Sequence, residues 1–257
     1  MEFLLIGLVS LIASGLTFFS GFGLGTILLP VFALFFPLEL AISLTAIVHL
    51  LNNLFKLLLT YRHGNTRVVL TFGLPALFSA FIGAYVLQNL SGLAPLHTYQ
   101  LGDKTFEISP LKLVIASLLF FFSLMELLPG FKKLQFSPKY LAPGGLLSGF
   151  FGGLTGNQGA LRSAFLLRAG LSKESFIASG VMIACMIDVS RLSVYSGHFP
   201  DFSDLKTFSL LLCAVLSAFL GALWGNLLVK KITINSLQIL VSVFLIVFSV
   251  LLGIGIL

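Results

Sequence analysis

The sequence contains little charge: Asp, Glu, Lys and Arg together make up 9% of its 257 residues. Soluble domains usually carry about 25% charged residues, so this chain lacks the polar surface that a water-soluble globular protein needs. Apolar residues take the place of charge, since 58% of the chain is hydrophobic and 27 residues are phenylalanine. The scarcity of charge therefore predicts an integral membrane protein that is surrounded by a lipid bilayer.

Cysteine and catalytic motifs are also scarce. The two cysteines, Cys185 and Cys213, both lie within apolar runs and form no CxxC pair, so we expect neither a disulfide framework nor a metal site. The sequence has no spacing typical of a Ser-His-Asp set or a nucleophilic cysteine, and no phosphate-binding loop. These absences argue against an enzyme, against a cofactor and against ATP-driven transport by this chain alone.

The net charge of +6 does not indicate nucleic-acid binding, because the basic residues lie mostly in short gaps between apolar runs. In such gaps, lysine and arginine set the orientation of a membrane protein. Basic gaps are expected on the cytoplasmic side, and acidic gaps near 90–109 and 197–205 on the outside. The basic residues in question are Arg62, Arg67, Lys132, Lys133, Lys139, Lys230 and Lys231, and the acidic ones are Asp103, Glu107, Asp201 and Asp204.

A membrane-spanning helix needs about 20 mainly apolar residues. Runs of this kind lie near 38–61, 67–89, 110–130, 175–196, 206–229 and 234–256. Two longer stretches, about 3–36 and 141–170, contain the glycine clusters "GFGLG" (Gly21 to Gly25) and "GGLTGNQG" (Gly152 to Gly159). We expect each cluster to break its stretch into two arms, which predicts an all-α membrane protein with about 8–10 membrane segments.

The chain repeats itself. "SAFIGA" (Ser79 to Ala84) returns as "SAFLGA" (Ser217 to Ala222), and several polar residues recur at a spacing of 135 positions, among them Asn53 with Asp188 and Lys56 with Arg191. This pattern predicts two repeats, 1–135 and 136–257, each a glycine-broken hairpin plus three helices. Within each hexapeptide, the serine and glycine form a small-xxx-small pair that lets membrane helices pack closely.

The charge pattern favours opposite orientations for the two repeats. If each broken stretch folds back as a hairpin, one repeat crosses the membrane an odd number of times, the second is inverted and both termini lie outside. If the stretches are single kinked helices, the repeats are parallel and fit the charge pattern less well. Inverted repeats with broken helices are the plan of many secondary transporters.

The broken helices are the first candidates for a binding site. A helix break exposes backbone N–H groups and a positive dipole end, which suit an anion; close helix packing is the alternative role for these glycines. Arg162 lies within an apolar stretch, where charge usually faces a cavity or a partner, although its side chain could instead reach the cytoplasmic surface. The candidate residues here are Gly23, Gly25, Gly156, Asn157, Gln158 and Arg162.

The duplicated polar pairs are the second candidates. Asn53 and Lys56 share a helix face because they are three residues apart, and Asp188 and Arg191 repeat this arrangement. Two roles stay open for Asp188, which either neutralises Arg191 or titrates and couples transport to protons. His49, one turn before Asn53, is a second proton-coupling candidate, with polar packing as the alternative.

Several segments resemble the TauE/SafE family, also called the toluene-sulfonate uptake permease family. The first half carries "GFGLGTILLP", "ELAISLTA" and a helix ending before "RHGN", and the second half carries "GGLLSGFFGGLTGNQGA" and "SFIASGVM". The resemblance covers nearly the whole chain and implies a bacterial-type inner-membrane carrier for sulfite, sulfoacetate, sulfonates or related anions. The segment "GNQGALR" departs from the family pattern, which has more glycine and apolar residues there.

Together these observations predict a secondary transporter that moves a small sulfur-containing anion across the inner (plasma) membrane by alternating access. Its expected partners are the anion, the lipid bilayer and, if transport is coupled, protons. An anion channel, a structural subunit and a carrier for another organic anion, such as a carboxylate, are the alternatives.

Overall fold

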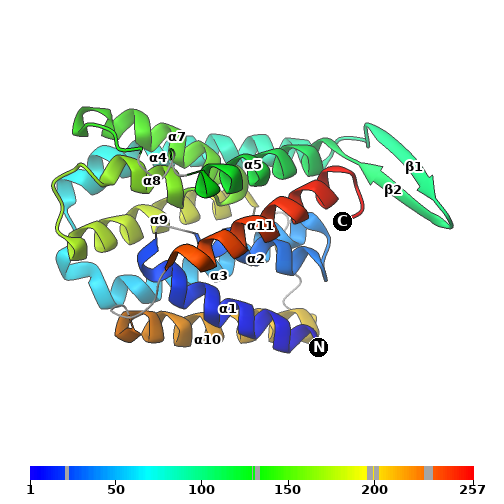
Figure 1. The fold of residues 1–257 in the computed structure, drawn as a ribbon, viewed down its shortest axis with the longest axis horizontal. Coiled ribbons are helices and arrows are strands. Elements are labelled where there is room, and N and C mark those ends of the chain that lie inside the picture. Colours follow the sequence, from blue (N-terminus) through cyan, green and yellow to red (C-terminus); the bar gives the residue numbers. More distant parts are fainter. Residues whose placement is uncertain (21–22, 129, 131–133, 196–198, 200–202, 229–233) are drawn as a thin grey trace.

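The computed structural model describes residues 1–257 apart from 21–22, 129, 131–133, 196–198, 200–202 and 229–233. The described residues form a bundle of helices with one small β-hairpin (Figure 1). The elements in chain order are α1 (Glu2–Ser20), α2 (Leu24–Ala33), α3 (Leu38–Thr60), η1 (Tyr61–His63), α4 (Thr66–Ser91), β1 (His97–Leu101), β2 (Lys104–Ile108), α5 (Pro110–Leu127), η2 (Pro138–Tyr140), α7 (Leu141–Thr155), α8 (Gly159–Leu166), α9 (Lys173–Tyr195), α10 (Leu205–Leu228) and α11 (Ile234–Gly253).

The helices have the length and composition of membrane spans. Within the described residues, five are long and apolar enough to cross a bilayer: Leu38–His63, Thr66–Ser91, Pro110–Leu127, Lys173–Tyr195 and Leu205–Gly225. Three shorter apolar helices cover Glu2–Thr17, Leu24–Ala33 and Ile239–Gly253. The prediction of a helical, multi-pass membrane protein is confirmed.

The β-hairpin is a departure from the all-α prediction. β1 and β2 pair antiparallel, from His97 opposite Ile108 to Leu101 opposite Lys104, within the segment that the sequence assigned to an external gap. The hairpin projects beyond the helices (Figure 1), and the Tyr99 hydroxyl donates a hydrogen bond to the Ile254 carbonyl. It therefore joins the loop after α4 to the C-terminal end of the chain.

Both glycine clusters interrupt helices as predicted. α7 ends at Thr155 and α8 begins at Gly159, and Gly156 between them has a left-handed backbone with φ of 79°, a conformation that favours glycine at a helix C-terminus. Ser148 of α7 donates a hydrogen bond to the Gln158 carbonyl at 3.1 Å, so α8 folds back against α7. In the first cluster, α1 ends at Ser20 and α2 begins at Leu24, while Gly21 lies outside the described residues.

Helices α3 and α9 cross the centre of the bundle in opposite directions. At one end the Asn65 backbone donates to Ser179, in the middle His49 meets Asp188, and at the other end Ser43 and Tyr195 line the same pocket. Figure 1 shows these two helices between α4 and α7 on one side and α1 and α10 on the other. Their antiparallel contact places polar residues of both halves of the sequence together.

Small residues bring two further helix pairs into close contact. Gly83 of α4 lies against the backbone of Phe150 and Leu154 on α7, leaving no room for a side chain. Gly221 of α10 lies in the same way against the backbone of Leu11 and Gly15 on α1. The packing role predicted for the two hexapeptides is confirmed, and it explains why glycine occupies the same place in both.

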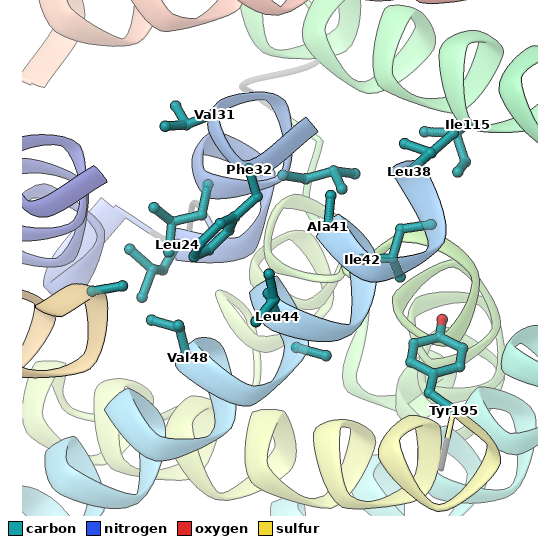
Figure 2. Close-up of a cluster of buried hydrophobic side chains, with 14 of the residues drawn as sticks. Leu24, Val31, Phe32, Leu38, Ala41, Ile42, Leu44, Val48, Ile115 and Tyr195 are labelled. Carbon is teal, nitrogen blue, oxygen red and sulfur yellow. The ribbon is translucent and has the colours of Figure 1, made fainter. Parts of the chain in front are cut away.

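The largest apolar cluster surrounds α2 and α3. Figure 2 shows Leu24 and Phe32 of α2 beside Leu44 of α3, all buried, with Tyr195 of α9 on the far side of α3. Because α2 is short and buried along most of its length, its packing against α3 fixes the position of the first helix break.

The two ends of the bundle differ in the sign of most of their described charges. The N- and C-termini and the β-hairpin lie at one end of the bundle (Figure 1), together with the acidic Asp103, Glu107 and Asp204. The opposite end carries the exposed basic residues Arg62, Arg67, Lys139, Arg168 and Lys173. Lys104, Lys112 and Lys206 lie at the mainly acidic end, and Glu126 and Glu174 at the mainly basic end. Lys132, Lys133, Lys230, Lys231 and Asp201 lie outside the described residues.

Candidate functional site

The centre of the bundle holds a fully buried carboxylate, Asp188 of α9. Its Oδ2 lies 2.6 Å from His49 Nδ1 and accepts a hydrogen bond from Asn53 Nδ2 at 3.1 Å, both from α3. Its Oδ1 accepts a hydrogen bond from Arg191 Nε at 3.0 Å. Asp188 therefore neutralises Arg191, as one sequence interpretation predicted, and also binds the histidine that the other interpretation requires.

Arg191 connects this carboxylate to the second helix break. Its side chain is 1% exposed, and its Nη2 lies 2.9 Å from Asp188 Oδ1 without the alignment of a hydrogen bond. A Cβ added at Gly156 would lie only 2.7 Å from Arg191 Nη1. The guanidinium thus fills the space beside Gly156, and it is not a residue that extends to the membrane surface.

The two helix breaks meet each other. Thr26, in the first turn of α2, donates a hydrogen bond from Oγ1 to Asn157 Oδ1 at 2.6 Å. A Cβ added at Gly23 would lie 3.5 Å from the Gly156 carbonyl oxygen, and one at Gly25 would lie 3.7 Å from His49 Cδ2. The breaks, the Arg191 guanidinium and the His49–Asp188 pair consequently form one continuous buried polar region.

Several buried N–H donors in this region make no protein hydrogen bond among the residues that the structure describes. They are Asn157 Nδ2, Gln158 Nε2 and Arg191 Nη2, of which Arg191 Nη2 is ion-paired with Asp188 Oδ1 at 2.9 Å. Buried polar groups in folded proteins nearly always have hydrogen-bond partners. The two unsatisfied amide groups and the adjacent guanidinium at the junction of two helix breaks can therefore bind the oxygens of an anion.

The other two predicted cations flank this region. Arg162 of α8 donates from Nη1 to Gln158 Oε1 at 3.0 Å, and a Cβ added at Gly180 of α9 would lie 3.6 Å from its Nε. Lys56 is 4% exposed, so its side chain does not reach the surface. With the Asn52 amide oriented to satisfy its neighbours, Asn52 Oδ1 accepts a hydrogen bond from Lys56 Nζ at 3.2 Å.

Two residues of this region were missed by the sequence prediction, Thr26 and Tyr195. Thr26 directly follows the glycine cluster, and this position beside the helix break could have identified it from the sequence. Tyr195 lies one turn after Arg191, and its hydroxyl donates a hydrogen bond to the Gly153 carbonyl in the last turns of α7. It also lines a pocket with Glu39, Ile42, Ser43, Leu87, Gln88, Ser91 and Leu111, so Tyr195 lies between this pocket and the second break.

Comparison with known proteins identifies the family. Residues 5–252 match the family model described as sulfite exporter TauE/SafE. No curated protein matches the sequence at a significant level. Members of the matched family are membrane transporters and not enzymes. Since the match covers nearly the whole of a chain whose helices have the length and apolar composition of membrane spans, the protein belongs to the TauE/SafE sulfite exporter family.

Proposed function

We propose that the protein is a secondary transporter that carries a small sulfur-containing anion, such as sulfite, sulfoacetate or another sulfonate, by alternating access. The main structural support for the proposal is the buried polar region where the two helix breaks contact each other. There the buried donors Asn157 Nδ2 and Gln158 Nε2 make no protein hydrogen bond among the described residues, and Arg191 Nη2 makes only an ion pair with Asp188 among them. Family membership supports the transport of a small anion across a membrane.

The chemistry of the junction suits an oxyanion. Sulfite and sulfonate groups present three oxygens, and the three side chains offer two amide N–H groups and one guanidinium N–H group. Helices α2 and α8 begin at the junction, beside Gly23 and Gly156, and the N-terminus of a helix favours negative charge. Arg162 and Lys56 add positive charge around the junction, so the substrate we expect is an anion.

The proposed mechanism needs two halves that move against each other. We assign these halves to 1–135 and 136–257, related as inverted repeats. The equivalent packing of Gly83 against α7 and Gly221 against α1 supports this assignment. So does the pairing of helices, because α1 contacts α2 as α7 contacts α8, and α3 contacts α10 as α9 contacts α4.

The orientation follows from charge. Cytoplasmic loops of membrane proteins are enriched in lysine and arginine. We therefore place the end with Arg62, Arg67 and Lys139 in the cytoplasm, and the termini and the β-hairpin outside. The inner (plasma) membrane is the proposed location, and the His49–Asp188 pair is the proposed site of proton coupling.

Binding is the first test of this function. Purified protein is screened for thermal stabilisation by sulfite, thiosulfate, sulfate, sulfoacetate, taurine and carboxylate analogues. Asn157→Ala removes one proposed donor, and a hydrogen bond to a charged group contributes about 1.5–3 kcal/mol, so the dissociation constant should rise about tenfold or more. Asn89→Ala is the matched control, because the exposed Asn89 amide donates to the Tyr85 carbonyl at 2.7 Å and forms no other hydrogen bond with the described residues.

Transport in liposomes is the second test. A carrier should show saturable uptake and counterflow of a selected sulfur anion, both weakened in Asn157→Ala and unchanged in Asn89→Ala. Selective binding of a carboxylate would overturn the sulfur assignment and leave the carrier. Flux that rises without saturation and without counterflow would indicate a channel. Equal binding by the two variants would refute the assigned site.

A further inference from the structure

The Asp188 carboxylate has one oxygen for each of two cations. Oδ2 faces the His49 ring at 2.6 Å, and Oδ1 faces Arg191 at 3.0 Å from Nε and 2.9 Å from Nη2. Arg191 in turn lies beside Gly156, at the junction where the anion is proposed to bind. A charge on His49 is therefore connected to the anion site through a single carboxylate and a single guanidinium.

Protonation of His49 changes the charge balance of this chain of contacts. With neutral His49, Asp188 and Arg191 cancel each other, and the three side chains carry no net charge. With protonated His49, the same carboxylate faces two cations and the net charge becomes positive. Arg191 then has less of its charge cancelled by Asp188 and attracts an anion at the junction more strongly.

The contacts of His49 also determine which of its two ring nitrogens gains or loses the proton. Because Asp188 accepts a hydrogen bond from Nδ1–H, the nitrogen left to gain or lose a proton is Nε2. Cδ2, which is bonded to Nε2, is the ring atom that faces Gly25 in the first turn of α2. The Cγ–Cδ2 edge of the ring thus lies beside the first helix break, on the side of the proposed anion site.

We propose that one proton, carried by His49, binds together with one anion, so that the two cross the membrane in the same direction. This inference rests on the proposed function and deepens it, because it names which residue of the pair carries the proton, the direction in which the proton moves relative to the anion, and the sign of the linkage. The anion binds more tightly when His49 is protonated. By thermodynamic reciprocity, anion binding increases the proton affinity of His49 by the same factor.

Other charged groups near His49 do not alter this sign. Asp188 and Arg191 reach it from α9 and Lys56 from its own helix. Arg162 of α8 and Cys185 of α9 lie within electrostatic reach of Asp188. Arg162 adds positive charge whether or not His49 is protonated, and Lys56, as a cation or a neutral amine, adds no negative charge. A proton gained at His49 makes the region more positive in every case, and so favours an anion.

Proton uptake on anion binding is the direct test. The purified wild-type protein, in weakly buffered solution with a pH-sensitive dye, is mixed with the sulfur anion that stabilises it most. At a pH between the titration of free His49 and that of anion-bound His49, a coupling of about tenfold predicts uptake of about half a proton per bound anion, and an affinity that rises about tenfold as the pH is lowered through this range. Anion binding without proton uptake, or with proton release, would overturn the inference.

Three variants locate the proton. His49→Gln keeps a hydrogen-bond donor for Asp188 but cannot titrate, so its anion affinity should be weak, independent of pH and without proton uptake. Asp188→Asn removes the carboxylate that cancels Arg191, so above the pH at which free His49 titrates its anion affinity should exceed that of the wild-type protein. His63→Gln, at an exposed histidine of η1, is the matched control and should retain the wild-type pH dependence.

The outcomes separate the two proposals. Retention of wild-type proton uptake in His49→Gln would overturn the assignment to His49. If Asp188→Asn does not fold, the wild-type and His49→Gln measurements still decide the question. Failure of the wild-type protein to bind any anion at either pH would overturn the proposed function itself. Anion binding that is independent of pH would leave that function intact and refute only the coupling.

Discussion

Replacement of Gly156 by alanine tests whether the second helix break positions Arg191. Gly156 has φ of 79°, and a Cβ added there would lie 2.7 Å from Arg191 Nη1. Although that nitrogen is the far end of a long side chain, Arg191 is 1% exposed and bonded to Asp188. The guanidinium therefore has little freedom to move aside, and alanine should displace it from the carboxylate.

The structure provides a matched control for the size of this effect. Gly170 has nearly the same backbone conformation, with φ of 71°, but no atom lies within 4 Å of its added Cβ. Gly170→Ala should therefore be destabilised only by the cost of holding an L-residue in a left-handed backbone conformation, about 1–2 kcal/mol. Gly156→Ala should also lose a charge-assisted hydrogen bond, which contributes about 1.5–3 kcal/mol, so its total loss of stability should be roughly 2.5–5 kcal/mol.

Two measurements check this prediction. Unfolding in detergent should show a larger loss of stability for Gly156→Ala than for Gly170→Ala. Titration with the stabilising anion should show at least tenfold weaker binding for Gly156→Ala and wild-type binding for Gly170→Ala. If both variants lose the same stability and bind the anion equally well, Gly156 does not position Arg191 and the reasoning is refuted.

Three further predictions concern single contacts. Thr26→Val removes the 2.6 Å hydrogen bond to Asn157 and should weaken anion binding about 2- to 10-fold in calorimetry, whereas Thr26→Ser should bind normally; equal affinities would refute a role for the hydroxyl. Gly83→Leu cannot fit against α7 and should prevent recovery of monodisperse protein in size-exclusion chromatography; normal recovery would contradict the packing. Hydrogen bonds from Thr207 hold the pKa of Asp204 below its ordinary value. Their contribution to stability is therefore present at neutral pH and is lost as acid protonates Asp204. Thr207→Val should lower the melting temperature at pH 7 more than at pH 3.

The helices were predictable because membrane composition leaves a strong signal. The apolar runs near 38–61 and 110–130 became α3 and α5 with boundaries only a few residues away. The β-hairpin at 97–108 was not predicted, because the search for long apolar runs treats any polar gap as a loop. Short strands with exposed side chains, such as His97–Leu101, contain no long apolar run by which they could be recognised.

The site was predictable in its residue types but not in its contacts. Asn157 was selected because it lies in the second glycine cluster, Arg191 because it belongs to a duplicated polar pair, and Arg162 because charge within an apolar stretch usually faces a cavity or a partner. The sequence could not show that Asn157 bonds to Thr26, which lies 131 residues away. Nor could it show that Asp188 binds His49 as well as Arg191. Contacts of this kind depend on how α2, α3 and α9 pack, and no local pattern encodes that packing.

The proposed symmetry explains why some repeated residues stayed alike and others diverged. In the proposed repeats, Asn53 and Asp188 are equivalent residues, and the structure places them in contact, with 3.1 Å between Asn53 Nδ2 and Asp188 Oδ2. A residue near a two-fold axis meets its own counterpart, and two carboxylates about 3 Å apart cannot both be ionised. An amide in one copy and a carboxylate in the other remove this conflict. Gly83 and Gly221 contact other residues of the opposite half, so both copies retain glycine.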